Sequence, residues 1–164
     1  MNYNSAMKTA DKPKWYQVVN EEHKWMINMG VWEAVPRSNV PKDSKVISTT
    51  WVMKKNTNGN FRARVNARGF MQVAGEHYMV DSISSPVTNK ATIRLVLVLL
   101  IIFRCTNELV DMKGSSHCGN FQEEKLIYMK VPKGFEKHYL GDVFLLLLRI
   151  ICGLKQAVRA FGGN

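Results

Sequence analysis

The stretch that most constrains the fold is residues 46–65, where two β-prone runs flank an Asn58-Gly59 pair. The runs, residues 46–55 and 61–65, are rich in side chains that favour extended backbone. Asn-Gly between two such runs is the strongest short-range signal for a β-hairpin, because the turn needs residues that tolerate positive φ. We therefore expect a hairpin with Asn58 and Gly59 as its turn residues.

The expected hairpin also carries much of the positive charge of the chain. The 164 residues include 23 lysines and arginines against 13 aspartates and glutamates, a net charge of +10. Residues 42–68 hold seven basic residues and one acid, a net +6 in 27 positions. Strand alternation places Arg62 and Arg64 on the same face. Two interpretations stay open here: a solvated hairpin whose lysines protect a sheet edge, or a surface that grips phosphates.

Outside the hairpin, helices and strands are mixed without a regular alternation, which favours an α+β fold. Hydrophobic periodicity predicts the following elements: helices over 15–29 and from about Lys90 to Arg104 with Thr88 as N-cap, strands over 108–112, 125–131 and 143–151, and helical character over 153–161. The polar residues 1–14 are expected to be disordered, and residues 162–164 to form a short tail.

Several classes of protein are excluded. The longest apolar run, residues 95–103, has nine residues, whereas a membrane-spanning helix needs about 20, so we expect a buried helix or strand and no membrane anchor. Cys105, Cys118 and Cys152 are too few and too widely spaced for a disulfide framework or a zinc site. No dinucleotide-binding, Walker A or zinc-protease motif occurs. An intracellular location is expected, in a cytoplasmic particle or the nucleus.

Short motifs follow one another in a fixed order along residues 15–161. They are Trp15 with Glu21-Glu22, then GVWEAVP (30–36), WVMK (51–54), the Asn58-Gly59 turn, FRAR (61–64), ARGFMQ (67–72), SPV (85–87), ATIR (91–94), LVDMK (109–113), YMKVPKGF (128–135) and GLKQAVRAF (153–161). Each motif alone is weak evidence, but the ordered series is specific. The chain resembles the reverse transcriptase of copia-type retrotransposons.

The resemblance implies a polymerase shaped like a right hand. Residues 15–161 would supply the fingers and the first part of the palm, an incomplete domain. The family reaction is the RNA- or DNA-templated addition of deoxynucleotides. The resemblance also implies Mg²⁺ as the cofactor, and a template–primer and a deoxynucleoside triphosphate as the partners.

For the basic hairpin, the resemblance favours the phosphate-gripping interpretation. By position, Lys55 and Arg62 are similar to the family's triphosphate-gripping cations. Arg64 and Arg68 would lie near the phosphates or the template strand. Such a role suits cations that neutralise phosphate charge through directed hydrogen bonds.

Two further sites follow from the resemblance. Residues 153–161 resemble the element beneath the template–primer, so Lys155 and Gln156 are candidate substrate contacts. Asp111 stands where the family carries its first catalytic aspartate, which ligates two Mg²⁺ ions. Without the flanking motifs, Asp111 would be interpreted as a strand-end aspartate in a turn.

Departures from the family pattern weaken the expectation of catalysis. The family's two further aspartates lie in a later hairpin, and this chain stops at Asn164 before it. Ser116 stands where the family has an aromatic residue that excludes ribonucleotides, and Val158 stands where it has proline. We therefore expect a fragment that does not catalyse the reaction alone. The alternatives are a basic nucleic-acid-binding remnant and a transposon relic without function.

Overall fold

The computed structural model describes residues 1–80, 89–106, 108 and 126–157. In chain order the elements are α1 (Tyr3–Ala6), α2 (Lys12–Asn28), β1 (Trp32–Pro36), β2 (Thr49–Lys55), β3 (Phe61–Ala67), α3 (Lys90–Ile102), β4 (Ile127–Lys130) and β5 (Val143–Leu147). Short 3₁₀ turns are η1 (Arg37–Asn39), η2 (Gly69–Met71) and η5 (Glu136–His138). The mixture of helices with small sheets agrees with the predicted α+β class.

Two antiparallel sheets form the body of the molecule. One has the strand order β1-β5-β4, and the other is the β2–β3 hairpin. Within the described residues, one isolated parallel bridge, between Ile47 and Met129, joins them. Its hydrogen bonds run from the Ile47 amide to the Tyr128 carbonyl, 2.8 Å, and from the Lys130 amide to the Ile47 carbonyl, 2.9 Å. The hairpin is therefore attached to the larger sheet at its base.

The hydrophobic core lies between α2, the hairpin and the three-stranded sheet. Trp15 of α2 packs edge-to-face on Phe61 of β3, with ring centroids 4.6 Å apart. Trp51 of β2 packs in the same way on the fully buried Phe135, and its indole N–H donates to the Lys133 carbonyl at 2.9 Å. These aromatic contacts fix one face of the hairpin against the rest of the body.

An aromatic cluster fastens α2 to η5. The buried His23 stacks on His138 with ring centroids 4.1 Å apart. Its Nε2 lies 3.2 Å from the Tyr139 hydroxyl, which also accepts a hydrogen bond from the Trp32 indole at 2.8 Å. Burial, helped by His138 and the nearby Lys137, lowers the pKa of His23 to about 4. The cluster therefore favours the neutral form of the His23 imidazole.

The hairpin was predicted correctly, but its turn differs from the expectation. Lys55 pairs with Phe61, so the loop spans residues 56–60. The Gly59 amide donates to the Asn56 carbonyl at 2.9 Å, and Gly59 has φ +77° while Asn58 has no positive φ. In this longer loop, built around a turn of residues 56–59, only Gly59 needs a positive φ, which glycine adopts without steric cost.

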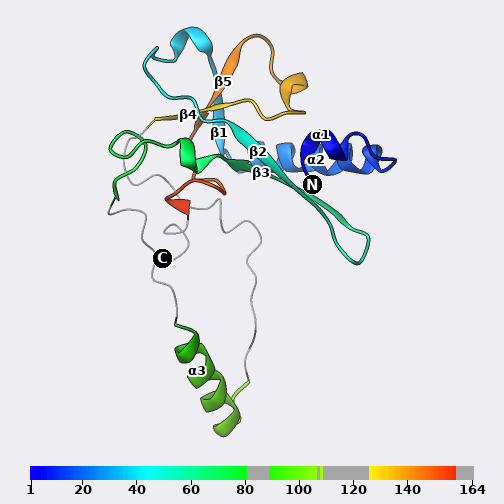
Figure 1. Ribbon diagram of the computed structural model, residues 1–164, viewed down its shortest axis with the longest axis vertical. Helices are drawn as coiled ribbons and strands as arrows, with labels where there is room; N and C mark the ends of the chain where they lie inside the picture. The colour runs from blue at the N-terminus through cyan, green and yellow to red at the C-terminus, as the bar shows by residue number, and fades with distance from the viewer. Residues whose placement is uncertain (81–88, 107, 109–125, 158–164) are drawn as a thin grey trace.

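The prediction that residues 1–14 are disordered is wrong. Within them α1 forms, with the Asn2 side chain accepting from the Ser5 amide at 2.8 Å, and α2 already begins at Lys12. Ala6 is fully buried, and the N-terminal ammonium donates to the Met53 carbonyl at 3.2 Å. Figure 1 shows α1 and α2 beside the hairpin. Long-range packing orders this segment, and its polar composition gives no sign of that.

Helix α3 confirms the predicted helix but not its burial. Its N-cap is Asn89, whose side chain accepts from the Ala91 amide at 2.9 Å, while the predicted cap Thr88 lies outside the described residues. None of its residues is buried, and Figure 1 shows it apart from the two sheets. The apolar residues 95–103 therefore pack on no described part of the chain. Among the described residues, no helix is long and apolar enough to cross a membrane.

The strands predicted over 125–131 and 143–151 are confirmed as β4 and the shorter β5. The strand predicted over 108–112 falls almost entirely outside the described residues. Of the helix expected over 153–161, residues 153–156 form turns, Ala157 is helical, and the remaining positions lie outside the described residues. The helix does not begin at Gly153, because its φ of +91° cannot belong to a right-handed helix.

Candidate nucleic-acid interface

The hairpin presents one buried and one exposed face. Trp51 pairs with Val65 and Met53 with Ala63, and all four side chains are buried in the core. Since residues directly opposite in an antiparallel pair share a face, the alternate positions must point outward. The hydrophobic pattern of β2 and β3 thereby decides which basic residues face solvent.

The outer face of the hairpin gathers cations. Lys54 lies directly opposite Arg62, and Val52 lies opposite Arg64. Lys54, Arg62 and Arg64 are exposed, and within the described part of the chain none of them forms an ion pair. The predicted common face of Arg62 and Arg64 is confirmed. We call Lys54, Arg62 and Arg64 the outer cation triad.

Lys54 is a candidate site residue that the sequence reasoning did not include. The signal was available, because a hairpin register that pairs Trp51 with Val65 also pairs Lys54 with Arg62. Like charges directly opposite each other on a sheet are destabilising. The pair of cations is therefore a local cost that an anion on this face would relieve.

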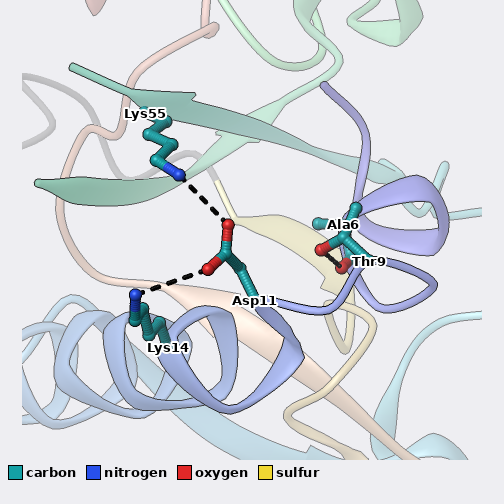
Figure 2. Close-up of polar contacts among 5 residues, drawn as sticks. All are labelled: Ala6, Thr9, Asp11, Lys14 and Lys55. Atoms are coloured by element: carbon teal, nitrogen blue, oxygen red, sulfur yellow. Dashed lines mark hydrogen bonds and ion pairs between the residues drawn. The ribbon is translucent and has the colours of Figure 1, made fainter. Parts of the chain in front are cut away.

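Lys55 points away from the outer cation triad. Its partner Phe61 belongs to the inner face, and the Lys55 ammonium lies 4.9 Å from the Phe61 ring centroid. Figure 2 shows its Nζ bonded to the Asp11 carboxylate, at 3.1 Å, while Lys14 holds the other carboxylate oxygen at 3.4 Å. The family resemblance implied that Lys55 and Arg62 both grip the triphosphate. In the structure the two residues lie on opposite faces of the hairpin.

Glu22 of α2 closes the free edge of the hairpin. Its Oε1 accepts from the Val65 amide at 3.2 Å, so this strand amide is paired. Desolvation raises the pKa of Glu22, while that hydrogen bond and the charge of Arg64 act in the opposite direction. A carboxylate from a helix therefore satisfies an edge amide that another strand could otherwise bind.

The segment after β3 is clamped against residues 152–157. The Ala67 amide donates to the Cys152 carbonyl at 2.9 Å. A β-carbon on Gly153 would overlap the Ala67 carbonyl, and one on Gly69 would overlap the Gly153 carbonyl. Two backbone segments approach this closely only where side chains are absent. Arg68 lies at this clamp with an exposed side chain, beyond the end of β3.

Lys155 and Gln156 belong to the clamp and not to the exposed cation surface. The buried Gln72 uses both ends of its amide: Nε2 donates to Gln156 Oε1, and Oε1 accepts from the Lys155 amide, each at 2.8 Å. Gln156 is itself buried, and its Nε2 donates to the His77 carbonyl at 3.4 Å. The Lys155 ammonium donates to the Tyr78 hydroxyl at 2.6 Å. Both predicted contacts are thus occupied by internal partners, and Gln72 was missed by sequence reasoning.

Asp111 lies outside the described residues, as do Ser116 and Val158. Across residues 1–80, 89–106, 108 and 126–157, no group of three or more histidine, cysteine, aspartate or glutamate side chains could hold a metal ion. The described cysteines, Cys105 and Cys152, are free. The described geometry thus offers a cationic surface without a metal centre.

Comparisons with known proteins bear on the whole chain. A family model described as "Reverse transcriptase (RNA-dependent DNA polymerase)" matches residues 30–163. The Retrovirus-related Pol polyprotein from transposon TNT 1-94 of Nicotiana tabacum is 30% identical over 154 residues, covering 91% of this chain and 11% of that protein. The polyprotein from transposon RE2 of Arabidopsis thaliana is 27% identical over 162 residues, 96% of this chain and 11% of that protein. The chain spans about a tenth of these curated relatives. No solved structure matches it.

Proposed function

Since the chain belongs to the reverse transcriptase family, which confirms the resemblance drawn from its motifs, we propose that the outer cation triad binds nucleic-acid phosphates. One observation carries the proposal: Lys54 and Arg62 lie directly opposite each other with no described acid to neutralise them. A phosphate between them replaces repulsion with two charge-assisted hydrogen bonds. The arginines add a planar fork that fits phosphate oxygens.

The same proposal extends to the polymerase as a whole. The hairpin is the fingertip of the fingers, residues 15–161 are fingers and partial palm, and the ligands are a template–primer and a deoxynucleoside triphosphate. The relatives' names, as Pol polyproteins of transposons, support this assignment. The location that suits such ligands is a cytoplasmic particle or the nucleus.

Catalysis by this chain alone is not part of the proposal. By the motif comparison, Asp111 would be one ligand of the Mg²⁺ that the family uses, and the metal would supply Lewis-acid chemistry at the primer hydroxyl. A primer-extension assay that compares the chain with its Asp111→Asn variant tests this role of Asp111. Mg²⁺-dependent synthesis that the substitution abolishes would support the role, and synthesis that survives it would contradict it.

The binding proposal is tested by salt titration. Affinity for single-stranded RNA and DNA oligonucleotides is measured against salt, since each neutralised phosphate contributes a slope of roughly −0.7 in log K against log salt. Replacing the three triad residues by alanine is expected to flatten the slope by roughly 2. Circular dichroism melts check that the variant stays folded, as expected for exposed positions.

Lys155→Ala serves as the matched control, because it removes one positive charge that is held by Tyr78. It is expected to leave the salt slope unchanged, whereas Lys54→Ala flattens it by roughly 0.7. Unchanged binding after loss of the whole triad would contradict the assignment to this face.

A further inference from the structure

We infer that Asp11 is an internal competitor for phosphate, holding Lys55 away from the nucleic acid that the outer cation triad binds. The inference rests on the proposed function, because it concerns the same basic hairpin. It gives a role to the N-terminal segment, which sequence composition alone predicts to be disordered. It also gives a reason why, among the described residues, Lys55 is the one basic residue of β2 and β3 that forms an ion pair.

The geometry of Asp11 is that of a bridge between two lysines. One carboxylate oxygen lies 3.1 Å from Lys55 Nζ and the other 3.4 Å from Lys14 Nζ. Figure 2 shows the carboxylate between the two ammonium groups, with Lys55 reaching it from the hairpin and Lys14 from α2. Both ammonium groups also lie near the Phe61 ring, 4.9 and 5.4 Å from its centroid. The contact thus joins the hairpin to the start of α2.

Asp11 is not engaged in capping its helix. It occupies the N-cap position of α2, where an aspartate side chain usually accepts an amide hydrogen bond, yet it makes none. The first turn of the helix carries no acid and includes Lys12 and Lys14. The Asp11 carboxylate therefore pairs with Lys14 and Lys55 instead of with the helix amides. The Lys55 hydrogen bond in particular keeps the pKa of Asp11 below its usual value, so the group stays anionic at neutral pH.

The contact is weak enough to be exchanged. The side chain of Asp11 is 34% exposed and that of Lys55 is 52% exposed. Ion pairs this open to water and salt contribute little to stability, so an incoming phosphate can compete for the ammonium. Because Asp11 also repels phosphates, its removal both frees Lys55 and lifts a local barrier to binding.

The test is a salt titration of a double-mutant cycle with a single-stranded oligonucleotide as probe. Asp11→Asn is expected to raise affinity about two- to five-fold at fixed salt and to steepen the slope by roughly 0.7, the signature of one more phosphate contact. Lys55→Ala is expected to leave the slope of the wild-type chain unchanged but to cancel the gain in the Asp11→Asn background. The cycle separates release of Lys55 from a general change in charge.

Asp142→Asn is the matched control. Asp142 is another exposed aspartate, paired at 3.2 Å with Arg37, and its substitution changes the net charge equally. An Asp11→Asn effect no larger than that of Asp142→Asn, or a wild-type slope that Lys55→Ala flattens, overturns the inference. Absence of any salt-dependent binding by the wild-type chain would instead overturn the proposed function. Thermal melts of each variant establish that the comparison is made between folded proteins.

Discussion

The outer face of the hairpin and the clamp at residues 152–157 were both predicted to contact nucleic acid, but their side chains differ in exposure and in internal bonding. On the hairpin, Lys54 and Arg62 stand opposite each other with exposed side chains. At the clamp, Gln156 is buried and Lys155 is bonded to Tyr78. Both regions contain basic or polar residues within motifs that resemble those of the family.

The two regions differ in whether their hydrogen-bonding side chains already have partners within the protein. At the clamp Gln72, Lys155 and Gln156 each have an internal partner, and breaking the bonds of the buried glutamines leaves a buried group unpaired. On the hairpin the cations are hydrated and can exchange water for phosphate with little loss. We therefore expect substitutions at the clamp to change the free energy of unfolding, and those on the triad to change binding.

The largest effect is expected from Gly153→Ala. The new methyl group meets the Ala67 carbonyl, and the backbone has φ +91°. Overlap and backbone strain together should lower the free energy of unfolding by about 3 kcal/mol or more, measured by urea denaturation. Gly141→Ala is the control, because its φ is +81° with open space around it, and it should cost about 1 to 2 kcal/mol. Equal losses would show that the clamp is not tightly closed.

A smaller loss is expected from Gln72→Ala. The substitution removes the partner of Gln156 Oε1 and of the Lys155 amide, both inside the clamp. The unpaired groups should lower the free energy of unfolding by about 2 kcal/mol, again by urea denaturation. Gln17→Ala removes an exposed glutamine bonded to Glu21 at 2.9 Å and should change it by less than about 0.5 kcal/mol. If Gln72→Ala also flattened the salt slope, the division between clamp and binding face would fail.

The pH dependence of stability extends the comparison to buried ionisable groups. His23 has a pKa of about 4 when folded, against an ordinary value of 6.5 when unfolded, and the pKa of its neighbour His138 is lowered too. Between these values the unfolded chain binds more protons, so stability is full above about pH 6.5 and declines as the pH falls towards 4. Thermal melts across this range should show the decline, and His23→Gln should make it shallower. A flat profile would mean that His23 is solvated.

The hairpin could be predicted from sequence because its information is local. Alternating apolar residues in β2 and β3 set the register, and Gly59 permits the turn. The same register determines that Arg62 and Arg64 face outward. Residues within the hairpin were sufficient for the register and for the outward position of the arginines. The hypothesis that this charge binds phosphate came instead from motifs spread over residues 15–161.

The partners of Lys55 and Gln156 could not be predicted, because they come from distant parts of the chain. Lys55 meets Asp11, 44 positions away, and Gln156 meets Gln72, 84 positions away. Neither hydrophobic periodicity nor motif spacing predicts contacts between residues so far apart in the sequence. Nor does the helical pattern of residues 90–102 reveal that none of their side chains is buried. Burial depends on what else packs nearby, and the local sequence does not contain that information.

The isolated bridge between Ile47 and Met129 has a consequence for how the chain is made. The hairpin and both N-terminal helices are complete by Ala67, whereas the strand that receives Ile47 begins only at Ile127. Hairpins form within about 10 μs, and a ribosome adds roughly 5 to 20 residues per second. The basic hairpin therefore emerges several seconds before the sheet that anchors its base. During that interval the hairpin has the two N-terminal helices to pack against, including the contact of Trp15 with Phe61.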